Sequence, residues 1–302
     1  MDTRAVDVPA AGGAAVAQLL DRAGWLELAP GMHVEDAAFI GAATPFRFDP
    51  AFAESARALL RAEGYLQIPP PDWRLPIADM AALITRLDAQ GIPVPFAFAY
   101  DEFWCLFGRL TGLLEAVLGA GFLRLPDFWA WRIDPRRDDS GWKPHRDKDW
   151  TTLFPDGAPK SATIWIPLTE ATPLNGCMYI VPADRDRAYG KPGDERGQFE
   201  YADIRALPAP AGTIFCWNQA VLHWGAHASA RETAPRIAVA FEYQSGQVPP
   251  YNQPVSSPYA VPDLRFRLQL IAKQILQYDH MYPLSPQIAS VARAIAALPA
   301  GG

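Results

Sequence analysis

The sequence contains only three cysteines among its 302 residues, Cys105, Cys177 and Cys216, an odd number without the spacing of a metal site. We expect them to be reduced, buried thiols of a cytoplasmic protein. Long apolar runs are also lacking, since no stretch approaches the roughly 18 residues that a membrane-spanning helix requires. The start of the chain has neither the basic region nor the apolar run of a secretory signal peptide. These absences argue against secretion and against a membrane partner.

Basic clusters are lacking as well. The net charge is −6 at pH 7 and no block of Lys and Arg stands out, so nucleic acid is not an expected partner. Hydrophobic residues make up 50% of the chain and charged residues 20%, proportions typical of globular proteins. A chain of this length can bury a substantial core as one large or two ordinary domains. The composition does not indicate whether the protein is a monomer or an oligomer.

Helical patterns dominate the first part of the chain. Apolar residues recur at helical spacing over Ile77–Leu87 and Asp101–Leu118. Two similar stretches, Leu19–Leu26 and Leu59–Leu66, each predict an amphipathic helix that ends at a glycine and is followed by a short strand. The match is short, and it does not establish a functional repeat.

The pattern changes at about residue 128, where short apolar or β-branched runs alternate with clusters of Gly, Pro, Asn and Asp. Such runs predict a β-sandwich or barrel. The predicted strands are Phe128–Ile133, Ala162–Leu168, Met178–Val181, Thr213–Trp217 and Ile237–Tyr243. Helical periodicity returns over Pro262–Tyr278 and Gln287–Leu298, after a loop over 245–262 that we expect near a site mouth. The predicted fold is mainly β with flanking helices, as a single domain: mostly helical over 1–124, a β core over 125–245, and a loop and helical extension over 246–302.

The residues His145 and Asp147 are the strongest chemical signal. In an extended segment, side chains two apart share a face, so both can reach one metal ion while Arg146 points away. His223, after a predicted strand, is the candidate third ligand, and His227 is its rival. Two histidines and one carboxylate with open positions form the facial triad of non-haem Fe(II) oxygenases. The alternative is a surface hydrogen bond between His145 and Asp147, with His223 packed among aromatic rings.

Several motifs resemble, in order and spacing, the phytanoyl-CoA dioxygenase family. They are His145–Asp147, Ala162–Leu168, Leu174–Pro182, Pro210–Phe215, Leu222–Gly225 and Pro235–Arg236. The resemblance implies a double-stranded β-helix, or jelly-roll, core that binds Fe(II) and 2-oxoglutarate and uses O2. It makes His145, Asp147 and His223 the iron ligands. Arg236 would hold the distal carboxylate of 2-oxoglutarate, as a planar guanidinium suits, and Trp165 would line the cosubstrate pocket. Arg231, in a polar turn, is the rival of Arg236.

The implied reaction is oxidative decarboxylation of 2-oxoglutarate to succinate, coupled to hydroxylation of a small-molecule substrate. The carboxylate of Asp147 disfavours halogenation, because related halogenases carry a small residue there; desaturation, ring closure and epimerisation stay open. Ala183-Asp184-Arg185 stands where the family usually has Gly-Ser-His, so the substrate class is open. The alternatives are a cupin-type metal enzyme that does not use 2-oxoglutarate and a non-enzymatic jelly-roll binding protein.

Three residues of one predicted strand are candidates for the substrate side of the site. Alternation puts Trp129 and Trp131 on the same face, where they form either a substrate wall or part of an ordinary core. Arg132, on the opposite face, is a candidate partner for a substrate carboxylate, and a solvated face is its alternative interpretation.

Overall fold

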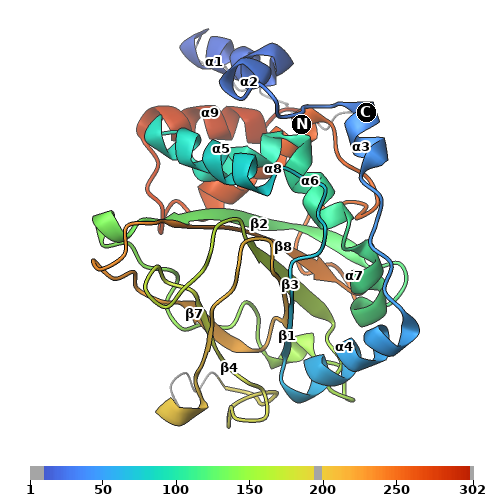
Figure 1. The fold of residues 1–302 in the computed structure, drawn as a ribbon. Helices are drawn as coiled ribbons and strands as arrows, with labels where there is room; N and C mark the ends of the chain where they lie inside the picture. The colour runs from blue at the N-terminus through green and yellow to red at the C-terminus, as the bar shows by residue number, and fades with distance from the viewer. Residues whose placement is uncertain (1–9, 194–198, 300–302) are drawn as a thin grey trace, which may run out of the picture.

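A computed structural model of the chain describes residues 10–193 and 199–299. Two antiparallel sheets lie beneath a layer of helices (Figure 1). The larger sheet has the strand order β1-β6-β3-β8-β2 and the smaller one the order β5-β4-β7. The strands are β1 (Tyr65–Ile68), β2 (Leu123–Ile133), β3 (Ser161–Pro167), β4 (Met178–Val181), β5 (Arg205–Leu207), β6 (Ile214–Asn218), β7 (Leu222–Gly225) and β8 (Arg236–Gln244).

Helices come before and after the strands that build the core. They are α1 (Ala10–Leu20), α2 (Arg22–Leu28), α3 (Ala37–Ala42), α4 (Pro50–Ala62), α5 (Ile77–Ala89), α6 (Asp101–Gly108), α7 (Thr111–Leu118), α8 (Leu264–Gln277) and α9 (Pro286–Ala296). The expected fold class, mainly β with flanking helices around a jelly-roll core, is confirmed. No helix in the described ranges combines the length and the apolar character needed to cross a membrane.

The larger sheet buries both of its faces because its strands alternate between two cores. Ile164 of β3 and Val239 of β8 point to the helical side, whereas Trp165 and Ala240 point to the smaller sheet, where they pack with Met178. Every second side chain of these strands therefore faces the space between the two sheets, and the alternation predicts which ones.

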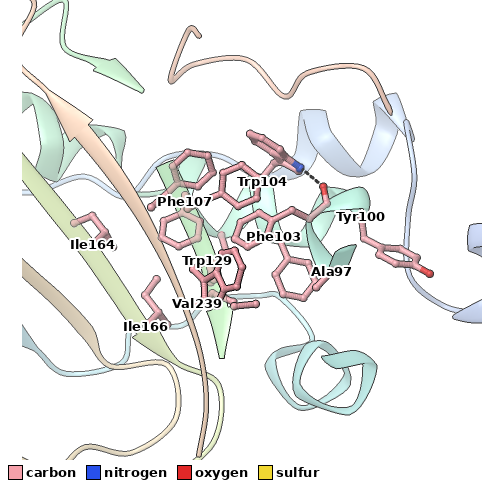
Figure 2. Packing of buried hydrophobic residues seen from close by; sticks show 14 of the residues in the cluster. Ala97, Tyr100, Phe103, Trp104, Phe107, Trp129, Ile164, Ile166 and Val239 are labelled. Carbon is pink, nitrogen blue, oxygen red and sulfur yellow. Dashed lines mark hydrogen bonds between the residues drawn. The ribbon is translucent and has the colours of Figure 1, made fainter. Parts of the chain in front are cut away.

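Aromatic side chains fix the helical face of this sheet. Figure 2 shows Trp104 and Phe107 facing the aliphatic side chains of the sheet. Trp104 also donates from Nε1 to the carbonyl oxygen of Phe98 at 2.7 Å, so that its one polar group is satisfied while the ring is buried. Each large apolar side chain buried in this way contributes about 1.5–3 kcal/mol to stability. The aromatic core therefore supports the sheet on the face opposite the site.

The first strand of the larger sheet comes from the mostly helical N-terminal part. Asp49 caps α4 by accepting from the amide of Phe52 at 2.7 Å. Gly64 ends this helix with φ +83°, a conformation that favours glycine, and the chain continues as β1 beside β6. The helix-glycine-strand prediction for Leu59–Leu66 is confirmed.

Two predictions for the N-terminal helices were wrong. In Leu19–Leu26, Asp21 starts α2 by accepting from the amide of Ala23, so Gly24 lies within that helix and no strand follows. The helix expected over Asp101–Leu118 is divided into α6 and α7, and the carbonyl of Arg109 at the break accepts instead from the amide of Phe46. A local helix cap decides the first case, and a contact with a distant segment decides the second.

Candidate metal centre and cosubstrate pocket

Three side chains from two separate segments meet at the mouth of the jelly roll. The Oδ1 atom of Asp147 lies 3.5 Å from Nε2 of His145 and 3.4 Å from Nε2 of His223. One potential ligand atom from each residue lies within 4.8 Å of the other two. Adjacent ligands about 2.1 Å from one octahedral ion are about 3 Å apart. The three atoms therefore fit around a single metal ion with little movement.

Main-chain pairing aligns the two histidines. His145 and His223 exchange backbone N–H···O bonds of 3.0 Å in both directions, which joins the His145 turn to β7. The Nδ1 atom of His145 lies 2.6 Å from the carbonyl oxygen of Lys143, and Nδ1 of His223 lies 3.1 Å from that of Val221. A proton on Nδ1 satisfies each carbonyl and leaves the lone pair of Nε2 for a metal. Arg146 points away to Asp186 at 2.7 Å, as strand alternation predicts.

The second oxygen of Asp147 is held by two neighbours. Thr163 of β3 donates from Oγ1 to Oδ2 at 2.6 Å, and Trp217 of β6 donates from Nε1 to the same oxygen at 2.9 Å. This leaves Oδ1 directed at the histidines. Burial acts to raise the pKa of Asp147, but the two histidines outweigh it and hold that pKa well below its usual range. The carboxyl group is therefore an anion, as a metal ligand must be.

Arg236 lies in the same cavity as the three ligands. It begins β8, is 2% exposed, and its Nε has no hydrogen-bond partner among the described residues. Burial lowers the pKa of the guanidinium to about 10, so it stays cationic at neutral pH. Trp165 lies beside it, with 5.5 Å from the Arg236 Cζ to the ring centre, and a Cβ added to Gly225 would come within 3.2 Å of Nη2. A buried cation with free donors fits an anionic ligand such as a carboxylate.

The cavity encloses about 570 Å³ of empty space, part of it open to solvent. Aromatic side chains make up much of its lining, among them Trp129 and Trp131, which lie opposite Ala240 and Ala238 in the β2–β8 register.

The comparisons with known proteins agree with this geometry. Residues 110–237, which include the three metal-site residues and Arg236, match the family model described as Phytanoyl-CoA dioxygenase (PhyH). Over these residues the chain carries a phytanoyl-CoA dioxygenase (PhyH) domain match. With an intact His-Asp-His set, it is a non-haem iron, 2-oxoglutarate-dependent enzyme. No curated protein matches its sequence.

Several solved structures share the fold of this chain. The non-haem α-ketoglutarate-dependent epimerase SnoN from nogalamycin biosynthesis has a TM-score of 0.52 and 22% identity, over 65% of this chain and 82% of SnoN. SnoN in complex with Fe3+, α-ketoglutarate and nogalamycin RO gives 0.51 and 20%, over 65% and 85%. Apo HygX from Streptomyces hygroscopicus gives 0.51 and 16%, over 66% and 90%. At these identities the likeness establishes the jelly-roll fold alone.

The rival residues proposed from the sequence lie outside the metal centre. His227 is exposed and pairs with Asp138 at 2.8 Å, and Arg231 is exposed in its turn. Arg132 does not line the cavity, because its buried guanidinium pairs with Asp88 at 3.2 Å and Asp134 at 3.0 Å. The structure therefore corrects the expectation that Arg132 meets a substrate.

The sequence analysis missed Thr163 and Trp217, the two donors to Asp147. Thr163 precedes Trp165 by two residues and so shares its inner face, a signal that alternation provides. Nothing local in the sequence indicates that Trp217 reaches the same carboxylate, since β6 and the metal turn are far apart in the chain.

We expect Thr163→Val to weaken Fe(II) binding about 10- to 100-fold, because outer hydrogen bonds to a ligand orient it. Valine keeps the shape of threonine and removes the donor to Asp147 Oδ2, together with the acceptor for Nε2 of Gln219. Anaerobic titration with Fe(II) measures the effect. Thr85→Val is the matched control, since the hydroxyl of Thr85 bonds only to the backbone within α5. Equal Fe(II) affinity in the two variants would contradict the role of Thr163.

Proposed function

We propose that this enzyme hydroxylates a small molecule at the expense of 2-oxoglutarate and O2. The proposed iron ligands are Nε2 of His145, Oδ1 of Asp147 and Nε2 of His223, and Arg236 would bind the distal carboxylate of 2-oxoglutarate. The observation that carries the proposal is the buried Arg236 guanidinium, with a free Nε donor, in the same cavity as the three ligands. A cupin-type enzyme without the cosubstrate would have no use for this buried charge, whose desolvation is costly.

The surrounding residues have definite tasks in this proposal. Bound iron would supply the activation of O2, and 2-oxoglutarate would supply two of the four electrons that reduce O2. Arg236 orients the cosubstrate by charge-assisted hydrogen bonds, Trp165 packs against the guanidinium, and Gly225 leaves room for it. Asp147 occupies the ligand position that halogenases leave open, which favours hydroxylation over halogenation.

Aromatic side chains form the proposed substrate wall. Trp131 and Trp142 meet edge to face at 5.5 Å, and the Trp142 ring centre lies 5.5 Å from that of His145. Trp129 packs against Tyr278 of the segment after α8. These rings exclude water from the reacting centre and offer stacking surfaces to a bound molecule.

Anaerobic titration of the apoprotein with Fe(II) and then 2-oxoglutarate tests the proposal. We expect the visible metal-to-ligand charge-transfer band of a chelated keto acid, and succinate formation once O2 is admitted. Iron binding without the band would favour the cupin-type enzyme. Absence of iron binding would contradict the proposed metal centre and leave a non-enzymatic binding protein.

A further inference from the structure

The inner face of β8 carries opposite charges at its two ends. The inward side chains are Arg236, Ala238, Ala240 and Glu242, so that two alanines separate the cation from the anion. On β2 the aromatic pair Trp129 and Trp131 is preceded by Asp127. The cavity is therefore lined by Arg236 on one side and by two carboxylates on the other. The proposed binding of 2-oxoglutarate by Arg236 uses only the cationic side of the cavity.

Glu242 lies next to the metal centre. It is the cross-strand partner of Thr163, which holds Asp147. Its side chain is largely buried, and one oxygen, Oε2, accepts from Nζ of Lys148 at 2.5 Å. Burial raises the pKa of Glu242 to about 7, although Lys148 acts in the opposite direction. The second carboxylate oxygen is left for another donor.

Asp127 is anchored from outside the cavity. It is 6% exposed, and both of its oxygens accept from the amide nitrogen of Asn252, at 2.7 and 3.0 Å. Lys273 in turn donates to Oδ1 of Asn252 at 2.7 Å. One amide group does not fill the roughly four acceptor sites of a carboxylate, so Asp127 is held in place while keeping acceptor capacity.

Aromatic rings enclose the space beside these carboxylates. The ring of Tyr278 lines the cavity and packs against Trp129 at 4.9 Å and Trp142 at 5.2 Å. The rings of Phe128 and Phe241 pack in the core on the helical side of the sheet. The indole nitrogen of Trp129 is buried, with no hydrogen-bond partner in the described part of the chain. An unpaired indole N–H calls for an acceptor atom on the ligand, separate from any ammonium group, because an ammonium group only donates. Carboxylates combined with aromatic faces are the usual surroundings of an organic ammonium group.

We propose that Asp127, Glu242 and the adjoining aromatic rings bind a cationic nitrogen, so that the substrate of the proposed oxygenase carries an ammonium group. The two ends of the cavity would then separate their ligands by charge, with the anionic cosubstrate at Arg236 and the cationic substrate at Asp127 and Glu242. The claim that this cation is the substrate rests on the proposed function, whereas the claim that the cavity binds a cation does not. A second metal ion fits less well, because Lys148 and Asn252 already direct donor hydrogens at the two carboxylates.

Four probes of similar size test the charge preference: benzylamine, benzyltrimethylammonium, benzyl alcohol and benzoate. Their binding is measured by calorimetry on the protein loaded with Ni(II) and 2-oxoglutarate, which blocks turnover. We expect at least one ammonium probe to bind roughly 10-fold more tightly than the alcohol, and benzoate most weakly. Preference for benzylamine indicates hydrogen bonds to the carboxylates, and preference for the quaternary probe indicates the aromatic faces; both support the proposal.

Asp127→Asn is expected to remove the preference for the ammonium probe and to leave the affinity for the alcohol unchanged. Asparagine keeps one acceptor for Asn252, and Glu242→Gln is the second variant should the first fail to fold. Glu54→Gln removes an exposed carboxylate far from the cavity and serves as the control. An alcohol that binds as tightly as both ammonium probes, equal weakening of all probes, or no binding of either ammonium probe would overturn the proposal.

The affinity for 2-oxoglutarate is measured separately in each sample. It is expected to be the same in Asp127→Asn as in the unsubstituted protein, because Arg236 is unchanged. Absence of 2-oxoglutarate binding in the unsubstituted protein would count against the proposed function, whatever the ammonium probes do. The two proposals can thus fail independently.

Discussion

Replacing His145 by alanine is expected to abolish Fe(II) binding at concentrations that saturate the unsubstituted protein. The substitution leaves only Asp147 and His223, and these two cannot define three adjacent positions on one ion. Loss of an outer hydrogen bond already costs about 10- to 100-fold in metal affinity, so loss of a ligand is expected to exceed about 100-fold. Anaerobic calorimetry with Fe(II) measures the affinity, and the charge-transfer band with 2-oxoglutarate is expected to disappear.

The matched control for this substitution is His227→Ala. His227 is exposed, is close to His223 in sequence, and bonds to Asp138 rather than to the metal centre. We expect its removal to leave Fe(II) affinity unchanged. Loss of iron binding in His227→Ala would contradict the assignment of His223 as the third ligand.

Arg236→Gln is expected to weaken 2-oxoglutarate binding by about 100-fold while Fe(II) binding persists. A buried, hydrogen-bonded charge pair across an interface is worth about 2–5 kcal/mol when one partner is truncated, and about 3 kcal/mol corresponds to this change in affinity. Glutamine removes the charge without leaving an uncompensated buried ion. Titration of the Fe(II)-loaded protein with 2-oxoglutarate, followed by the charge-transfer band, gives the dissociation constant.

Arg231→Gln is the control for the arginine substitution, because it removes the same charge from an exposed turn. It tests whether the effect arises from local contact or from net charge. Equal loss of 2-oxoglutarate affinity in the two variants would mean that general electrostatic attraction, and not a specific contact with Arg236, draws in the cosubstrate.

Strand alternation explains why much of the site could be predicted from the sequence. His145 and Asp147 are two residues apart, and Trp165 lies on a strand whose inner face follows from its pattern. The donors to Asp147 were harder to predict, because Trp217 reaches the carboxylate only through the pairing of β6 with β3. Pairing between distant segments depends on packing that no local pattern contains.

The same limit applies to charged residues. The sequence places Arg132 on the face opposite Trp131, but it cannot show that the guanidinium of Arg132 forms ion pairs with Asp88 and Asp134. Nor does the sequence connect Asp127 with Asn252, which lies far away in the loop over 245–262. Side-chain partners across such separations follow from the folded topology alone.

The reciprocal backbone bonds between His145 and His223 have a consequence for metal selection. Ordering a residue's backbone costs about 1–2 kcal/mol in conformational entropy. At His145 and His223 this entropy is lost during folding and not during metal binding. A cage formed in advance accepts any divalent ion that its two nitrogens and one oxygen suit, and intrinsic affinity then rises from iron through cobalt and nickel to copper. Raw affinity alone would therefore not select iron, so loading with iron also depends on which ions are available where the protein folds.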